Sequence, residues 1–195
     1  MERIIKDILM ESIEVKEAFI REQGAQIAAL AEQIASAFTR DRKLLLCGNG
    51  GSAADAQHLA AEFVNRFQLE RPPLPALALT TDTSVLTSIA NDYDFDQVFS
   101  KQVAALGAAG DVLLVLTTSG RSKNIVKAVE AARKAGLYTA ALLGGDGGEV
   151  RRMADLAMVV KSKTTARVQE AHILAGHMLC HLVDYILFQR HLNES

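Results

Sequence analysis

The stretch Asp111–Ser122, DVLLVLTTSGRS, decides the fold. After Asp111 come five apolar residues in a row, a pattern typical of a strand that is buried on both faces of a parallel sheet. A polar turn with several hydroxyl groups follows, and residues 123–135 have the pattern of a helix. This order of strand, polar turn and helix predicts one unit of an α/β fold.

The same alternation continues on both sides of this stretch. Short apolar runs predict further strands at 43–47, 76–79, 138–143 and 156–160. Helical patterns cover 2–20, 25–39, 53–66, 83–106 and 165–190, with an interruption near Asn91 and Asp92. We therefore expect an α/β fold, a doubly wound parallel sheet sandwiched by helices. The chain forms one domain over 1–195, with an N-terminal helical extension over about 1–40.

Composition excludes several classes of protein. The 195 residues include 21 basic and 23 acidic side chains, so the chain lacks the basic surface of an ordinary nucleic-acid-binding protein. Two cysteines cannot build a disulfide framework. Neither a targeting segment nor an apolar run of about 20 residues is visible. We expect a cytoplasmic protein that binds neither nucleic acid nor a membrane. The leading helices and the long last helix carry more apolar surface than one small sheet needs, which predicts oligomerisation.

Two loops after predicted strands are candidates for binding an anion. In Gly48–Ser52 the glycines let a ligand approach the backbone, and the helix that follows attracts negative charge. The spacing of Gly48, Gly50 and Ala53 also matches a loose dinucleotide motif, but the acidic residue expected after the next strand is missing. A plain tight turn remains the other interpretation of this loop.

The second loop follows the central strand and places four hydroxyl side chains around Gly120. Hydroxyls and backbone amides together can surround a phosphate group. A helix cap needs only one hydroxyl, so four of them favour a phosphate site. A third loop, GGDGG at 144–148, has the composition of a structural turn.

Polar side chains at helical spacing suggest where chemistry takes place. His58 and Glu62 are four residues apart and share a helix face, where they fit a metal site, an acid–base pair or a solvated polar pair. Gln169 and His177 are eight residues apart on the last helix, about 12 Å along its axis. They converge on one point only if they reach toward each other, or if a neighbouring subunit contributes. His172 and His181, which leave the same helix at other angles, are expected to be structural or exposed.

Four stretches carry a resemblance to a known family: GNGGSAADAQHLAAEF (48–63), ALTTDTSVLTSIANDY (78–93), GDVLLVLTTSGRSKNIVKA (110–128) and ARVQEAHILAGH (166–177). Together they resemble the phosphoheptose isomerases of the sugar-isomerase (SIS) domain group, from about residue 40 onward. The resemblance implies an aldose–ketose isomerase that converts sedoheptulose 7-phosphate to D-glycero-D-manno-heptose 7-phosphate through an enediol(ate). This reaction is the first step toward ADP- or GDP-heptose for cell-surface lipopolysaccharide. A homotetramer with sites at subunit interfaces and one zinc ion per subunit are implied too.

The resemblance also implies the roles of individual residues. Glu62 and His177 are the expected base and acid, in either order. The expected metal ligands are His58, Glu62, Gln169 and His177. The expected substrate contacts are Asn49, Gly50, Gly51, Glu62, Asn91, Asp92, Thr117, Thr118, Ser119, Ser122 and Gln169. Many relatives have serine where this chain has Thr117, which keeps the hydroxyl group.

Two other functions fit the same scaffold. A SIS protein that binds the replication initiator DnaA has a stretch similar to NRFQLERPPLPALAL at 65–79, but it lacks equivalents of Glu62 and His177, which this chain has. A SIS sensor would bind a sugar phosphate without turning it over, usually beside a DNA-binding domain, and the sequence contains no such domain. We therefore expect an enzyme.

Overall fold

Five parallel strands form one sheet in the order β2-β1-β3-β4-β5, in a computed structural model that describes residues 1–190. The strands are β1 (Leu44–Gly48), β2 (Ala76–Ala78), β3 (Val112–Thr117), β4 (Tyr138–Gly144) and β5 (Leu156–Val160). The strand order reverses between β1 and β3, because β2 lies on the other side of β1. In open α/β sheets such a switch point is where ligands bind, beyond the carboxyl ends of the strands.

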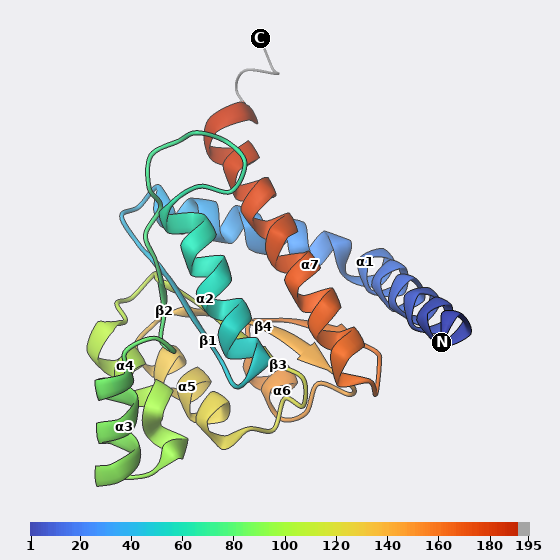
Figure 1. Ribbon diagram of the computed structural model, residues 1–195. Coiled ribbons are helices and arrows are strands. Elements are labelled where there is room, and N and C mark those ends of the chain that lie inside the picture. The colour runs from blue at the N-terminus through green and yellow to red at the C-terminus, as the bar shows by residue number, and fades with distance from the viewer. Residues whose placement is uncertain (191–195) are drawn as a thin grey trace.

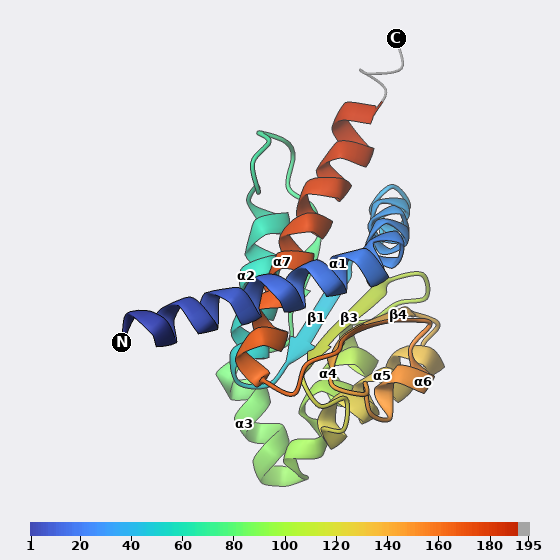
Figure 2. The ribbon, with the colours of Figure 1, turned by 90° about the vertical axis from the view of Figure 1, so that its right-hand side faces the viewer.

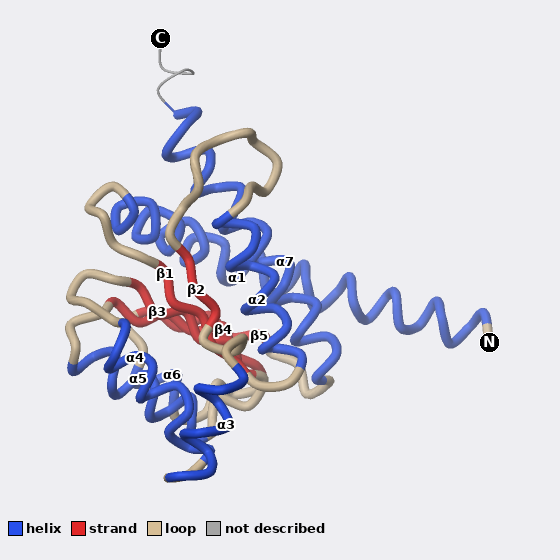
Figure 3. The backbone as a smooth tube through the Cα atoms, turned by 60° about the vertical axis from the view of Figure 1, so that its left-hand side comes forward, coloured by secondary structure: helices blue, strands red, loops and turns tan. Residues whose placement is uncertain are grey.

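Helices cover both faces of the sheet, as Figures 1 and 3 show. One face carries α1 (Glu2–Phe38), α2 (Gly51–Val64) and α7 (Thr165–Asp184), which a π-helical turn over Tyr185–Gln189 continues. The other face carries α3 (Thr83–Asp92), α4 (Val98–Leu106), α5 (Lys123–Lys134) and α6 (Val150–Met153), with a 3₁₀ turn over Phe95–Gln97 between α3 and α4. The predicted doubly wound sheet is confirmed.

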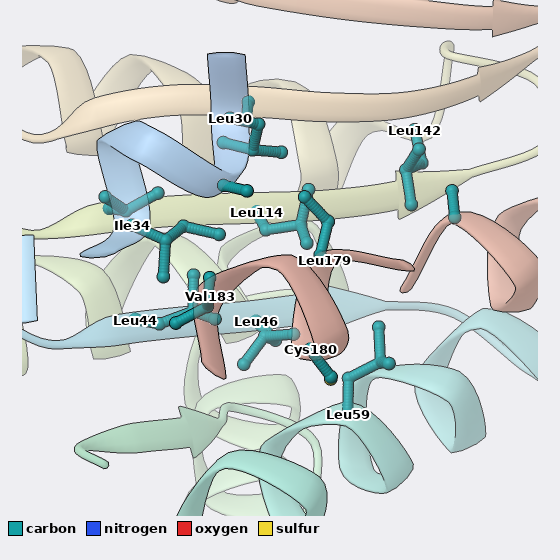
Figure 4. Close-up of a cluster of buried hydrophobic side chains, with 14 of the residues drawn as sticks. Leu30, Ile34, Leu44, Leu46, Leu59, Leu114, Leu142, Leu179, Cys180 and Val183 are labelled. Atoms are coloured by element: carbon teal, nitrogen blue, oxygen red, sulfur yellow. The ribbon is translucent and has the colours of Figure 1, made fainter. Parts of the chain in front are cut away.

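Alternate strand residues supply two separate cores. Leu46 and Leu114 pack toward α1, α2 and α7, in the cluster that Figure 4 shows in close-up. Leu45 and Leu113 point the opposite way and pack against α4 and α5. Because both faces are covered, every residue of β1 and β3 is buried, which explains the unbroken apolar runs in the sequence.

The N-terminal segment differs from the prediction of two helices. It forms one helix of 37 residues, α1, whose two halves run in different directions (Figures 1 and 2). A glycine lowers helix propensity but does not end a helix, and α1 continues through Gly24. Residues 1–11 are all exposed, including the apolar side chains of Ile4, Ile5, Ile8 and Leu9. The start of α1 therefore projects from the body of this chain (Figure 2).

Helices α2 and α7 lie against each other and run in the same direction. At one end a Cβ on Gly51 would come 2.4 Å from Gln169 Nε2, and further along a Cβ on Gly176 would come 2.5 Å from Leu59. His58 directly precedes Leu59, and His177 directly follows Gly176. The two histidines therefore meet beside this contact. The close approach at Gly176 therefore fixes which residues of the two helices face each other.

Within residues 1–190, one helix, Thr165–Gln189, is long and apolar enough to cross a membrane by length and composition alone. Its apolar window has a mean hydropathy of 1.4, and 44% of that window is buried inside the chain. The helix packs against α1, α2 and the sheet.

Candidate functional site

The loops after β1 and β3 lie side by side at the switch point of the sheet. The pairing of Gly48 with Leu116 brings the ends of the two strands to the same level. Asn49 and the buried Asn124 exchange two hydrogen bonds between their side-chain amides, at 3.0 and 2.8 Å. This pair of side chains joins the loop at Gly48–Ser52 to the first turn of α5. Sequence reasoning missed Asn124, because nothing in the local pattern distinguishes it from a surface residue of a helix.

The loop 117–122 presents hydroxyl groups at the start of α5. Thr117 is buried and its Oγ1 accepts a hydrogen bond from the Gly120 amide at 3.2 Å. Ser119 is exposed, and Thr118 and Ser122 are half-buried. Ser122 occupies the N-cap position of α5 but makes no capping hydrogen bond with its side chain. A hydroxyl at a helix N-terminus that is not used for capping can bind an anion together with the helix amides.

The GGDGG segment (144–148) packs against the loop 117–122, which we call the hydroxyl loop. Gly120 has a φ of +62°, and a Cβ there would lie 2.0 Å from the Gly147 carbonyl oxygen. Arg121 turns away from the loop to pair with Asp146 at 2.5 Å, which lowers the pKa of that carboxyl to about 2. The expected structural role of GGDGG is consistent with these contacts. No substrate role follows for Arg121 from this geometry.

A second group of polar side chains lies further along α2 and α7. His58 Nε2 is 2.9 Å from His177 Nε2 and 3.5 Å from Glu62 Oε1. Phe67, in the loop after α2, stacks on the His177 ring with 5.5 Å between ring centroids. The Glu62 carboxylate and the His177 imidazole therefore both lie next to the His58 ring, and side chains of these types serve in acid–base and metal sites. We call His58, Glu62 and His177 the histidine–glutamate cluster.

Asp55 adds a further carboxylate one turn before His58. Burial raises its pKa, while the nearby His58 and His177 act in the opposite direction. His172, on the same helix as His177, is fully buried, and His181 is exposed. Both histidines lie outside the cluster, as the sequence analysis expected.

The structure does not bring every predicted site residue together within one chain. Gln169 lies against Gly51, at the loop end of the paired helices, and no hydrogen bond of the described residues joins it to the cluster. Asn91 and Asp92 are exposed at the end of α3, where Asn91 Nδ2 donates to Asp92 Oδ1 at 2.9 Å. Gly50 and Gly51 lie at the start of α2, with Gly50 at a φ of +56°.

Comparison with known proteins identifies the class first. Residues 9–144 match the model of the SIS domain, so the chain belongs to the SIS-domain proteins. Similar curated sequences narrow this class. The chain is 51% identical over 187 residues to the phosphoheptose isomerase of Nitratidesulfovibrio vulgaris strain Miyazaki F, covering 96% of this chain and 90% of that one. It therefore belongs to the phosphoheptose isomerase family and is an isomerase.

Other relatives agree with this assignment. The phosphoheptose isomerase of Sulfurimonas denitrificans is 47% identical over 190 residues, covering 96% of this chain and 97% of that one. The solved phosphoheptose isomerase GmhA of Neisseria gonorrhoeae superposes with a TM-score of 0.89 at 45% identity, covering 94% of this chain and 98% of the other. These relatives give no support to the DnaA-binding alternative.

Proposed function

We propose that this chain interconverts sedoheptulose 7-phosphate and D-glycero-D-manno-heptose 7-phosphate, at the start of the route to ADP- or GDP-heptose. The reaction moves a carbonyl between C2 and C1 of a phosphorylated seven-carbon sugar. The observation that carries the proposal is that Glu62 and His177 both lie within reach of His58 Nε2. Family membership supports the choice of substrate, and the nearness of Glu62 and His177 to His58 supports their assignment as base and acid.

The phosphate group binds in this proposal at the loops after β1 and β3. Thr117, Thr118, Ser119 and Ser122 offer hydroxyls there, and the first turns of α2 and α5 offer amides and positive dipole ends. Asn49, Gly50 and Gly51 complete the binding surface on the other loop. Binding at this end fixes where the opposite end of the sugar lies, which lowers the entropy cost of reaching the transition state.

The spacing along α2 suits a long sugar. Seven residues separate Gly51 from His58, which is about 10 Å along a helix at 1.5 Å per residue. An extended seven-carbon chain that is held by its phosphate can bridge this span, whereas a three-carbon sugar phosphate cannot. The separation of the two groups of residues therefore favours a long sugar phosphate over a three-carbon one, which is consistent with a heptose phosphate.

Proton transfer is assigned to Glu62 and His177. Glu62 removes a proton from C1 of the ketose, and the C1–C2 bond becomes the double bond of an enediol(ate). His177 donates a proton to the oxygen on C2 and accepts one from the oxygen on C1. Glu62 then returns its proton to C2, which gives the aldose. A positioned acid–base pair of this kind contributes roughly 10²–10⁴ in rate.

The side chains of the cluster fit a zinc ion by their chemistry. Two imidazole nitrogens and a carboxylate oxygen are the donor set of many catalytic zinc sites. His58, Glu62 and His177 would hold the ion, although the described residues include no such group already arranged around a common point. Gln169, the fourth expected ligand, would have to come from elsewhere, because this chain's own Gln169 lies against Gly51. When bound, zinc polarises a carbonyl and stabilises negative charge on its oxygen.

We also propose that the enzyme is a homotetramer with its sites at subunit interfaces. Two observations support association: the exposed apolar residues at the start of α1, and the distance of Gln169 from the cluster within one chain. A neighbouring subunit that contributes Gln169, Asn91 or Asp92 would complete the site. A cytoplasmic location, without a membrane or nucleic-acid partner, belongs to the same proposal.

Replacing Glu62 tests the assignment of the base. Glu62→Gln should lower kcat on sedoheptulose 7-phosphate by about 10²–10⁴ while KM changes little, because the phosphate loops are untouched. Glu130→Gln is the matched control, since Glu130 is exposed on α5 and far along the sequence from the cluster. Near-normal turnover by Glu62→Gln would remove Glu62 from the mechanism.

Metal analysis tests the zinc part separately. We expect about one zinc per chain in the purified protein, and less in His58→Asn. Dialysis against a chelator should lower turnover, and added zinc should restore it. Full turnover by protein shown to be free of metal would refute a role for zinc but would leave the acid–base assignment standing.

A further inference from the structure

Arg71 is a buried arginine in the loop between α2 and β2, outside the residues discussed so far. Its side chain is 1% exposed, and its guanidinium contacts two helices and the loop itself. The loop passes the end of α7 in Figure 1. Nε donates to Asp184 Oδ1 at 2.7 Å, Nη1 to the Phe63 carbonyl at 2.7 Å, and Nη2 to the Glu62 carbonyl at 3.0 Å.

The contacts with Glu62 and Phe63 cap the C-terminus of α2. The last carbonyls of a helix lack partners within the helix, and its terminal turn frays unless other groups bind them. Helix α2 ends at Val64, so Glu62 belongs to this terminal turn. Nη1 also reaches the carbonyls of Asn65, at 3.3 Å, and Pro72, at 3.1 Å. The Arg71 guanidinium therefore binds the backbone carbonyl of Glu62, the proposed base, and backbone carbonyls of residues that follow Glu62 in the chain.

The contact with Asp184 extends this network to the helix that carries His177. Asp184 is the last residue of α7, seven residues or about two turns beyond His177. The same loop includes Phe67, whose ring stacks on His177. Arg71 thus joins the ends of both helices on which the histidine–glutamate cluster lies.

We propose that Arg71, paired with Asp184, is a positioning residue that holds Glu62 and His177 in register for proton transfer. The inference rests on the function proposed above. Arg71 does not touch the sugar in this scheme and acts through the backbone of Glu62. The planar fork of arginine donates in several directions at once, whereas lysine offers a single point of charge. Arg71→Lys therefore keeps the charge but loses most of these contacts.

The test compares the kinetics of wild type, Arg71→Lys, Asp184→Asn, Glu62→Gln and the double variant Arg71→Lys/Glu62→Gln, each in the whole chain. Arg71→Lys should lower kcat about 100-fold, because a misplacement near 1 Å at a reacting group costs about that much, and KM for sedoheptulose 7-phosphate should change little. Asp184→Asn should lower kcat in the same direction. In a Glu62→Gln background, Arg71→Lys should cost about threefold or less, since residues that act through one another are not additive. A merely structural role would give the same loss in both backgrounds.

Lys43→Met is the matched control. Lys43 forms a 2.6 Å ion pair with the buried Asp111 at the start of β1 and β3, where it touches neither α2 nor α7 in the described contacts. This variant should lower the melting temperature but leave kcat near the wild-type value. Circular dichroism below the melting temperature of each variant confirms that the chains compared are folded. Should Arg71→Lys fail to fold, Asp184→Asn decides, alone and with Glu62→Gln.

The outcomes separate the inference from the proposed function. Wild-type kcat in Arg71→Lys or in a folded Asp184→Asn, beside an active wild-type protein, would overturn the positioning role alone. An equal loss in the Glu62→Gln background would overturn it as well. Absence of turnover in the wild-type protein would overturn the proposed function and this inference with it.

Discussion

Acidification should destabilise the fold through His172, a fully buried histidine on α7. Burial lowers the pKa of His172 from 6.5 to about 4, although the backbone of Leu143 opposes the shift. The unfolded chain therefore binds a proton at a higher pH than the folded chain does. Stability is at its full value above pH 6.5 and falls as the pH drops from there toward 4.

The size of the effect follows from the two pKa values. Each unit of difference corresponds to 1.36 kcal/mol once both transitions have been crossed. The fall from 6.5 to about 4 thus corresponds to roughly 3 kcal/mol in the acid limit. Between pH 7 and pH 5 only part of this range is crossed, and the free energy of unfolding should fall by about 2 kcal/mol because of His172 alone.

The contribution of His172 to the free energy of unfolding can be measured by urea unfolding of wild type and His172→Leu. Both proteins are unfolded at pH 7 and at pH 5, at a fixed protein concentration. Other titrating groups contribute equally to both proteins, so they cancel in the difference. Relative to wild type, His172→Leu should gain about 2 kcal/mol on going from pH 7 to pH 5, whatever its stability at pH 7. Two proteins with the same loss over this interval would refute the reasoning, because His172 would then titrate alike in the folded and unfolded chains.

Three substitutions test the packing around the site. Gly120→Ala should cost about 1–3 kcal/mol and raise KM, because the new Cβ would lie 2.0 Å from the Gly147 carbonyl at a φ of +62°. Asn124→Leu should cost about 1–3 kcal/mol in urea unfolding, because it leaves the amide of Asn49 without its partner. Leu59→Ala should cost about 2–5 kcal/mol by the same measurement, because Leu59 is fully buried between α2 and α7.

Gly24→Ala is the control for the glycine substitution. Gly24 lies inside α1, and nothing is within 4 Å of the position of an added Cβ, so alanine there should stabilise the helix by about 0.5–1 kcal/mol. A KM for Gly120→Ala that matches wild type would count against the hydroxyl loop as the phosphate site. For Asn124→Leu and Leu59→Ala, an unchanged urea midpoint would contradict the packing described here.

Local sequence patterns were sufficient to predict the sheet and the loops that follow its strands. The apolar run after Asp111 predicted a buried strand because it has no polar residue to place on an exposed face, and β3 is buried throughout. The hydroxyl loop and the interruption between α3 and α4 were also visible, since turns and caps depend on residues that are adjacent in sequence.

Contacts between distant segments were not predictable in this way. The bonds of Asn124 with Asn49 and of Arg71 with Asp184 join residues that are 75 and 113 positions apart. Spacing along one helix predicted that His58 and Glu62 share a face, but it gave no partner for them. In the folded chain Gly176 packs closely against Leu59, and this contact brings His177 next to His58. The continuity of α1 through Gly24 was missed because a glycine weakens a helix without specifying where it ends.

The projecting start of α1 has a consequence for handling the protein. Ile4, Ile5, Ile8 and Leu9 each expose about half or more of their surface to water over less than two turns of the helix. Exposed apolar side chains adsorb to surfaces, so the fraction of the protein that is lost to vessel walls should grow as the working concentration falls. A shortened chain that begins after residue 11 lacks these exposed apolar side chains and should adsorb less.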